Sequence, residues 1–259
     1  MKMKIKSLFI ILSAAVLVSC GTTVNLATYN VCGFHHSKTN SMKMVASMMK
    51  EWRPDAISIN ELDSCTTRRG EDVYQLKDFA EAMGGWNYNF GAALDYKGGK
   101  YGIGVVTPHK IINSWSIRLP KSDDREYRAL CVVETEKFIF CSTHIGLTKK
   151  SQIDQIDVID NFIEQHFNGS RKPVFLCGDM NAFPESETLK ALQKNWTVLS
   201  RTDDTTFSTH NPSRCIDYIL LYKNAAQCKT VGSFVGKSFK TGVTDIASDH
   251  FPVFLKARL

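Results

Sequence analysis

The sequence has only one long apolar run, residues 8–18, and that run is too short to cross a membrane as a stable helix. It follows Lys2, Lys4 and Lys6, and this order of positive charge and apolar residues is typical of an export signal. Because no other stretch of about 18 apolar residues follows, no further membrane span is expected.

Internal repeats, low-complexity tracts and linker-like segments are also missing. Their absence excludes a repeat array, and the 259-residue chain is long enough for one large α/β domain, which we expect over residues 24–259. A strong charge is missing as well, since the formal net charge is +6 at pH 7 and part of it lies in the export signal. Charge therefore does not by itself predict a nucleic acid partner.

The eight cysteines include no pair with zinc-ribbon spacing, so no structural metal held by cysteine is expected. Cys131, Cys141 and Cys177 lie in apolar, strand-like segments and are predicted to be buried free thiols. Without Cys20 the remaining cysteines are odd in number, so at least one stays unpaired within the chain, although export permits disulfides.

The export signal ends in Leu17-Val18-Ser19-Cys20-Gly21, which resembles the lipobox of bacterial lipoproteins. The resemblance implies a signal peptide of residues 1–19, cleavage before Cys20 and lipidation of its thiol. The protein is then expected to be exported and lipid-anchored at the bacterial outer membrane or cell surface, on the periplasmic side or the exterior. The lipid would be its only membrane contact, and we expect a monomer.

Apolar periodicity predicts many strands and a few well-separated helices, a pattern typical of two packed sheets with helices on their outer faces. In the helix expected over residues 151–167, only Asp160 interrupts the apolar stripe. The other expected helices cover residues 41–52, 73–83 and 186–194. The expected strands cover residues 24–30, 56–61, 102–107, 111–117, 128–135, 138–144, 174–177, 197–200, 216–222, 229–234 and 252–257.

Polar residues suited to a metal or a phosphate repeatedly follow or interrupt these apolar strands. One carboxylate at a strand end is easily explained by solvation. Buried carboxylates, however, are costly unless they are paired or metal-bound, so the repetition of polar residues at many strand ends favours a metal or phosphate site. Oxygen ligands without clustered cysteine favour Mg²⁺ or Mn²⁺ over zinc, and histidines beside them can transfer protons. The residues are Asn30, Glu61, His144, Asp179, Asn181, Asp217, Asp249 and His250.

These segments resemble the endonuclease/exonuclease/phosphatase superfamily, which includes deoxyribonuclease I. Each motif alone is weak, but they occur in the family's order across nearly all of residues 24–259. The matching segments are Thr28-Tyr29-Asn30-Val31, Asn60-Glu61-Leu62, Tyr101-Gly102-Ile103-Gly104, Ser142-Thr143-His144, Gly178-Asp179-Met180-Asn181-Ala182, Ile216-Asp217-Tyr218-Ile219 and Ser248-Asp249-His250-Phe251-Pro252-Val253.

The resemblance implies an α/β fold, a four-layer sandwich of two packed, mostly antiparallel mixed β-sheets flanked by helices. It also implies a site for Mg²⁺ or Mn²⁺, with one or two ions. Glu61 resembles the principal metal ligand, and Asn30 and Asp249 resemble the residues that complete the metal and phosphate site. Asp179 resembles the group that orients or deprotonates the attacking water, and Asn181 resembles the residue that holds the phosphate.

The resemblance further implies a set of groups around the phosphate. His250 resembles the phosphate-facing histidine, which Asp217 orients. His144 resembles the second histidine, which stabilises the pentacovalent state or assists the leaving group. Arg128 stands where several relatives place a phosphate-binding arginine, and Tyr101 is a softer match in the phosphate-binding set.

The predicted reaction is in-line attack of water on phosphorus with metal assistance, carried out by a phosphodiesterase or nuclease. Cys32 stands where abasic-site endonucleases carry a metal-binding aspartate, which argues against DNA repair. A sphingomyelinase-like lipid phosphodiesterase and an inositol or sugar phosphatase stay open as alternatives, and a catalytically dead surface-binding module is a remote one. A nuclease would need basic residues around the site, for which the candidates are Arg68, Arg69, Lys149, Lys150, Lys237 and Lys240.

Overall fold

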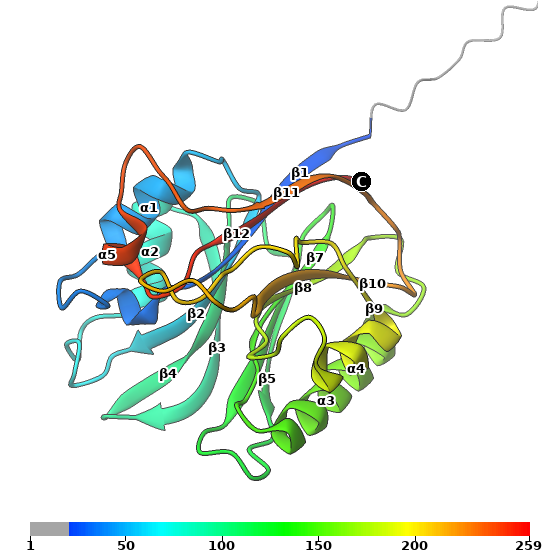
Figure 1. Cartoon of the computed structure of the whole chain (residues 1–259), viewed down its shortest axis with the longest axis horizontal. Helices are drawn as coiled ribbons and strands as arrows, with labels where there is room; N and C mark the ends of the chain where they lie inside the picture. The colour runs from blue at the N-terminus through cyan, green and yellow to red at the C-terminus, as the bar shows by residue number, and fades with distance from the viewer. Residues whose placement is uncertain (1–20) are drawn as a thin grey trace, which may run out of the picture.

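A computed structural model describes residues 21–259, and the expected signal peptide and Cys20 lie outside the described residues. Two six-stranded sheets pack face to face, and helices cover the outer face of each (Figure 1). Only the β1/β2 and β7/β8 pairs are parallel, so both sheets are mixed and mostly antiparallel. The predicted four-layer α/β sandwich is therefore confirmed.

The first sheet has the strand order β11-β12-β1-β2-β4-β3, and α1, α2 and α5 lie on its outer side (Figure 1). Its strands are β1 (Thr23–Asn30), β2 (Ala56–Ser64), β3 (Asn87–Tyr96), β4 (Gly99–Thr107), β11 (Lys229–Val235) and β12 (Val253–Arg258). Its helices are α1 (Met42–Lys50), α2 (Gln75–Met83) and α5 (Thr244–Ala247), and a short 3₁₀ turn, η1 (Cys32–Phe34), follows β1.

The second sheet has the order β5-β6-β7-β8-β10-β9, and α3 and α4 cover its outer side (Figure 1). Its strands are β5 (Asn113–Leu119), β6 (Arg128–Glu134), β7 (Ile139–His144), β8 (Val174–Asp179), β9 (Trp196–Val198) and β10 (Asp217–Tyr222). Its helices are α3 (Lys149–Phe167) and α4 (Glu187–Asn195).

Alternation along the strands explains how the layers are held together. In β1, Val24 and Leu26 lie in the core between the two sheets, whereas Ala27 and Tyr29 lie in the core under the helices of the first sheet. From Leu26 onward β1 is buried on both faces, and apart from Thr28 its residues there are apolar until the strand ends. Asn30, the polar residue that ends β1, is therefore placed at the edge of the sandwich but kept out of solvent.

The polar break in the long helix α3 also has a structural reason. Asp160 accepts hydrogen bonds from Asn195 Nδ2 at 2.8 Å and from Trp196 Nε1 at 2.6 Å, so it fastens the end of α4 to α3. The helix begins at Lys149, two residues before the predicted start at residue 151. The Thr148 side chain caps it by accepting a hydrogen bond from the Ser151 amide.

Strand β3, helix α5 and the short 3₁₀ turn η1 are absent from the sequence-based prediction. Strand β3 lies at the edge of the first sheet and eight of its ten residues are partly or fully exposed, so it lacks the apolar pattern that would have revealed it. Cys131, Cys141 and Cys177 are buried free thiols as predicted, and no disulfide forms within residues 21–259. In the same range, no helix combines the length and the apolar character that a membrane crossing requires.

Candidate active site

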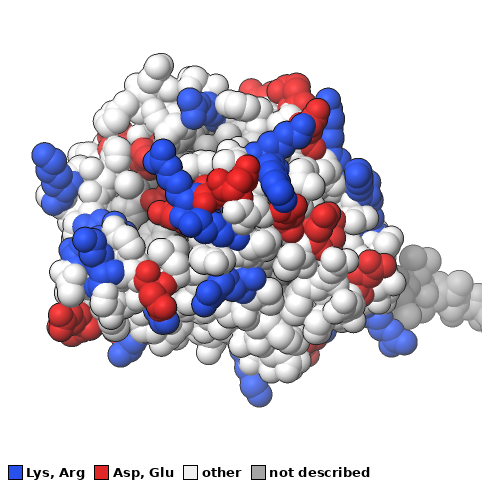
Figure 2. All heavy atoms as spheres, turned by 90° about the horizontal axis from the view of Figure 1, so that it is seen from below, with Lys and Arg blue, Asp and Glu red and all other residues white. Residues whose placement is uncertain are grey.

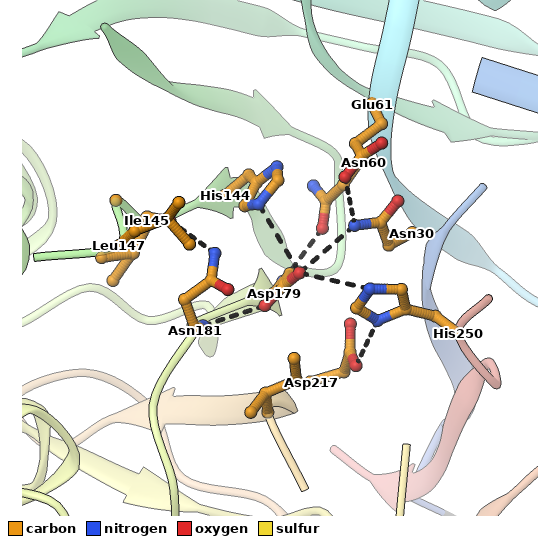
Figure 3. Close-up of polar contacts among 12 residues, drawn as sticks. Asn30, Asn60, Glu61, His144, Ile145, Leu147, Asp179, Asn181, Asp217 and His250 are labelled. Atoms are coloured by element: carbon orange, nitrogen blue, oxygen red, sulfur yellow. Dashed lines mark hydrogen bonds and ion pairs between the residues drawn. The ribbon is translucent and has the colours of Figure 1, made fainter. Parts of the chain in front are cut away.

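The site is centred on Asp179, the last residue of β8, whose side chain is almost fully buried. Three side chains from three other strands or strand ends approach its Oδ2 atom, as Figure 3 shows. Asn30 Nδ2 lies at 3.2 Å, His144 Nε2 at 3.5 Å and His250 Nε2 at 3.7 Å. Strand pairing explains the convergence, because His144 is in register with Asp179 across β7/β8 and Asp217 is in register with it across β8/β10.

Asn60 fixes the backbone beneath the site, and it was not among the predicted site residues. Its Oδ1 accepts the Asp179 amide at 2.9 Å, and its Nδ2 donates to the Thr143 carbonyl at 3.0 Å. One side chain of the first sheet thus ties the ends of β7 and β8 in the second sheet. The available signal was its position beside Glu61 at the end of an apolar run, which does not reveal that it crosses between sheets.

Gly178 leaves room for this arrangement. Its φ of +145° is rarely adopted by residues with a side chain, and a Cβ there would lie 1.8 Å from the Thr143 carbonyl oxygen. The residue before Asp179 must therefore be glycine if β7 and β8 are to approach this closely.

His250 is a cation in this environment. Its Nδ1 lies 2.9 Å from Asp217 Oδ2, and both side chains are buried. Burial opposes the charged imidazolium, but the Asp217 carboxylate, and after it Asp179 and Asp249, raise the pKa of His250 to about 10. Nδ1 therefore donates to Asp217, and the protonated Nε2 points towards Asp179.

His144 is neutral for the opposite reason. Burial, the Arg128 guanidinium and then His250 hold the pKa of His144 well below its usual value of 6.5. Arg128 Nη1 donates to His144 Nδ1 at 3.3 Å, so the single ring proton is on Nε2, on the side of Asp179. The site therefore contains one charged and one neutral histidine.

Asp179 is poised to exchange a proton near neutral pH. Burial and then the Asp217 charge raise the pKa of Asp179 to about 7, against the opposing effect of His250. Its other oxygen, Oδ1, accepts the backbone amide of Asn181 at 2.9 Å, which fixes the orientation of the carboxylate.

Glu61 projects into the site because β2 is irregular there. The register between β2 and β4 shifts between Ile59 and Leu62, and Glu61 adopts a φ of +63°. A bulge of this kind redirects a side chain, and left-handed backbone in a non-glycine residue is a strain that clusters at functional sites. The Glu61 carboxylate accepts from Asn30 Nδ2 at 3.0 Å.

The oxygen donors fit a hard divalent cation. Neither Glu61 nor Asp249 forms a salt bridge with a basic side chain anywhere in residues 21–259. Both carboxylates act on the Cys32 thiol, because burial and then the charges of Asp249 and Glu61 raise the pKa of Cys32 to about 12. Such concentrated negative charge favours a bound cation. Asn30 contributes differently, since its Oδ1 accepts the Cys32 amide at 3.1 Å while its Nδ2 faces the two carboxylates.

Two predicted residues lie at the margin of this cluster. The Asn181 side chain donates to the Ile145 carbonyl at 2.9 Å, which leaves its amide oxygen for other partners. Tyr101 does not contact Asp179, but lines a neighbouring cavity of about 170 Å³ together with Glu61, Arg68, Arg69 and Tyr96. In that cavity Arg68 is fixed by Asp63 at 3.0 Å and by the ring of Tyr96, whose centroid lies 4.6 Å away.

Most of the basic residues expected around a nuclease site have acidic neighbours. Lys149 pairs with Glu187, Lys150 with Asp154 and Lys237 with Asp204, whereas Arg68 and Arg69 share the single carboxylate of Asp63 and keep a net positive charge. Figure 2 shows the same character on the face seen from below, where positive and negative side chains are interspersed and neither sign forms a continuous field.

Comparison with known proteins agrees with the family resemblance found in the sequence. The model of the Endonuclease/Exonuclease/phosphatase family matches residues 27–250. Among curated proteins, none matches the chain's sequence significantly.

Several solved structures are similar in fold. An endonuclease/exonuclease/phosphatase from Bacteroides vulgatus has a TM-score of 0.74 and 18% identity, covering 92% of this chain and 99% of that one. A mannosyl-6-phosphatase from Bacteroides thetaiotaomicron has a TM-score of 0.69 and 17% identity, covering 91% and 100%. The human Nocturnin catalytic domain with bound sulfate has a TM-score of 0.67 and 16% identity, covering 91% and 93%.

Proposed function

The chain belongs to the endonuclease/exonuclease/phosphatase family, and from this premise we propose that it hydrolyses phosphodiesters by metal-assisted in-line attack of water on phosphorus. The observation that carries the proposal is the cluster around Asp179, in which a buried carboxylate able to accept a proton near pH 7 lies beside one charged and one neutral histidine. These are the groups that proton transfer and charge stabilisation at phosphorus require.

In this proposal each residue acts at a stated atom. Asp179 accepts a proton from the attacking water through Oδ2, while Asn181 holds Oδ1 in place through its amide. His250, kept protonated by Asp217, donates a hydrogen bond from Nε2 to a phosphate oxygen. The neutral His144 also donates to the phosphate, from its own Nε2. A Mg²⁺ or Mn²⁺ ion held by Glu61 and Asp249 would neutralise charge that develops on the phosphate.

Arg128 is proposed to orient His144 and to add positive charge beside the phosphate. Its guanidinium is buried, its Nη1 atom contacts His144 at 3.3 Å, and its Nε atom has no hydrogen-bond partner within the described chain. A buried donor without a partner is costly, so a substrate phosphate oxygen is a suitable acceptor for this group.

We further propose that the substrate is compact rather than a long nucleic acid. The cavity beside Glu61 is small, and its tyrosines and arginines suit one head group next to the scissile phosphate. The paired lysines and arginines leave little of the continuous positive charge that a nucleic acid backbone requires. A sugar phosphatase is the second candidate, favoured by this same small cavity and by the similarity to a mannosyl-6-phosphatase.

The proposed lipid anchor bears on the alternative of a lipid substrate. Strand β1 runs from Thr23 to Asn30, so the site lies about 25 Å from the start of the described chain at the usual rise per residue. If Cys20 is lipidated, the anchor and the site would lie towards opposite ends of β1. We therefore favour a soluble phosphoester over a phospholipid of the same membrane.

The test is a substrate panel assayed with Mg²⁺ and with Mn²⁺. It contains bis-p-nitrophenyl phosphate, p-nitrophenyl phosphate, sugar and inositol phosphates, sphingomyelin, single-stranded RNA and plasmid DNA. We expect cleavage of small diesters, reduced on the order of 10²–10³-fold or more in Asp179→Asn and His250→Asn. The control Asp95→Asn alters an exposed carboxylate on β3 and should be fully active. Cleavage of monoesters alone would replace the diesterase by the phosphatase, and full activity in both site variants would end the proposal.

A further inference from the structure

A second group of ligand-type side chains lies beside the proposed catalytic cluster and is not used by the mechanism above, except for Asp249. Ligand atoms of Cys32, His36 and Asp249 all lie within 4.8 Å of one another. A further imidazole is close by, because His210 Nε2 lies 3.3 Å from His36 Nε2. Cys32, His36 and Asp249 are each only partly buried, so an ion could reach them from solvent.

The chain holds this group together from three distant segments. Cys32 and His36 come from the turn after β1, where Cys32, Gly33 and Phe34 all have positive φ. The Cys32 amide donates to Asn30 Oδ1 at 3.1 Å, which anchors the turn to the catalytic cluster. On the other side, the Thr209 amide donates to the Asp249 carbonyl at 2.8 Å and brings the loop that carries His210 against the segment before β12.

The donor types differ from those of the hard-cation site. Glu61 and Asp249 offer oxygen, which suits Mg²⁺ and Mn²⁺, whereas a thiol with an imidazole suits Zn²⁺ and related borderline ions. Three protein ligands with nitrogen, sulfur and oxygen atoms also match the usual ligand number of a zinc site that keeps an open position.

We propose that Cys32, His36 and Asp249 form a site for a zinc-class divalent cation that shares Asp249 with the hard-cation site, with His210 positioned against the His36 imidazole. Asp249 has two carboxylate oxygens and can therefore contact both ions, as carboxylates in two-metal sites do. The proposal concerns ion binding only and does not depend on which phosphoester the protein cleaves.

The test uses Co²⁺ in place of Zn²⁺, because a cobalt–thiolate bond produces a charge-transfer absorption band that oxygen and nitrogen ligands do not produce. The purified, reduced full chain is titrated with Co²⁺, and we expect the band to saturate at one ion per chain and to disappear when Zn²⁺ is added. Cys32→Ser should abolish the band, and His210→Ala should weaken Co²⁺ affinity by about 10–100-fold, as loss of a supporting contact does. Cys65→Ser, which changes an exposed thiol elsewhere, should leave the band unchanged.

A second measurement on the unaltered chain guards against misfolding of the variants. Alkylation of each cysteine by iodoacetamide is mapped by mass spectrometry with and without Zn²⁺, and Zn²⁺ should slow alkylation of Cys32 at least tenfold but not that of Cys65. The proposal is overturned if no charge-transfer band forms, if the band persists in Cys32→Ser, or if Zn²⁺ leaves Cys32 as reactive as before. None of these outcomes depends on phosphoester cleavage, so they separate this site from the proposed activity.

Discussion

Replacing Asn60 by alanine should damage both the stability of the sandwich and the activity of the site, because this amide connects the two sheets directly beneath Asp179. The substitution removes the acceptor of the Asp179 amide and the donor to the Thr143 carbonyl. Each of the two buried partners left unsatisfied costs about 1–3 kcal/mol, so the total loss is roughly 2–6 kcal/mol. A loss of that size lowers the urea midpoint by roughly 1–2 M.

The effect on catalysis should appear in kcat rather than in KM. Asn60 does not line the substrate cavity, but it sets the position of the backbone that carries Asp179. A displacement of about 1 Å at a reacting group costs on the order of 100-fold in rate, which is the expected fall in kcat. Steady-state kinetics on a small diester, measured well below the unfolding midpoint, would show it.

Asn89 offers a matched control, since its side chain also bridges strands but lies away from the site. It donates to the Trp115 carbonyl at 3.0 Å and to the Val132 carbonyl at 3.3 Å. Asn89→Ala should therefore lower the urea midpoint while kcat per folded molecule stays unchanged. If Asn60→Ala kept both the wild-type midpoint and a kcat within twofold of wild type, the positioning role assigned to Asn60 would be refuted.

Three further outcomes are expected. Chelation by EDTA should abolish activity, and added Mg²⁺ or Mn²⁺ should restore it; activity that survives exhaustive chelation would contradict the metal requirement. Because activity needs protonated His250, it should fall as pH rises through a pKa of about 10, and Asp217→Asn, which removes the anion that raises this pKa, should move the fall towards 6.5 in a pH profile of kcat/KM. Gly178→Ala should destabilise the fold by about 3 kcal/mol or more in urea unfolding, whereas Gly232→Ala, where a Cβ meets nothing within 4 Å, should stay within about 0.5 kcal/mol of wild type.

The sequence was sufficient to predict the layers and most of the strands, because strands buried on both faces must be apolar. The same rule made the polar ends of β1, β7 and β8 visible, and the structure brings Asn30, His144 and Asp179 together there. Edge strand β3 escaped prediction because half-exposed residues need not be apolar.

Other features depended on contacts that no local pattern encodes. The role of Asn60 arises only when the first sheet packs on the second. The grouping of His36 with Asp249 depends on two loops whose paths are set by tertiary contacts. The ion pairs of Lys149 with Glu187 and of Lys237 with Asp204 likewise join segments that are distant in sequence. The sequence therefore did not reveal that these lysines are paired.

The pairing of β1 with β12 has a consequence for the time course of folding. The earliest strand of the sheet in chain order pairs along Thr23–Thr28 with one of the latest, along Val253–Arg258. Loop closure over so long a separation is slow, and β1 stays without this neighbour until the final segment has been synthesised. Since Asp249 and His250 lie just before β12, the protein should acquire its activity late, as one of its last folding events.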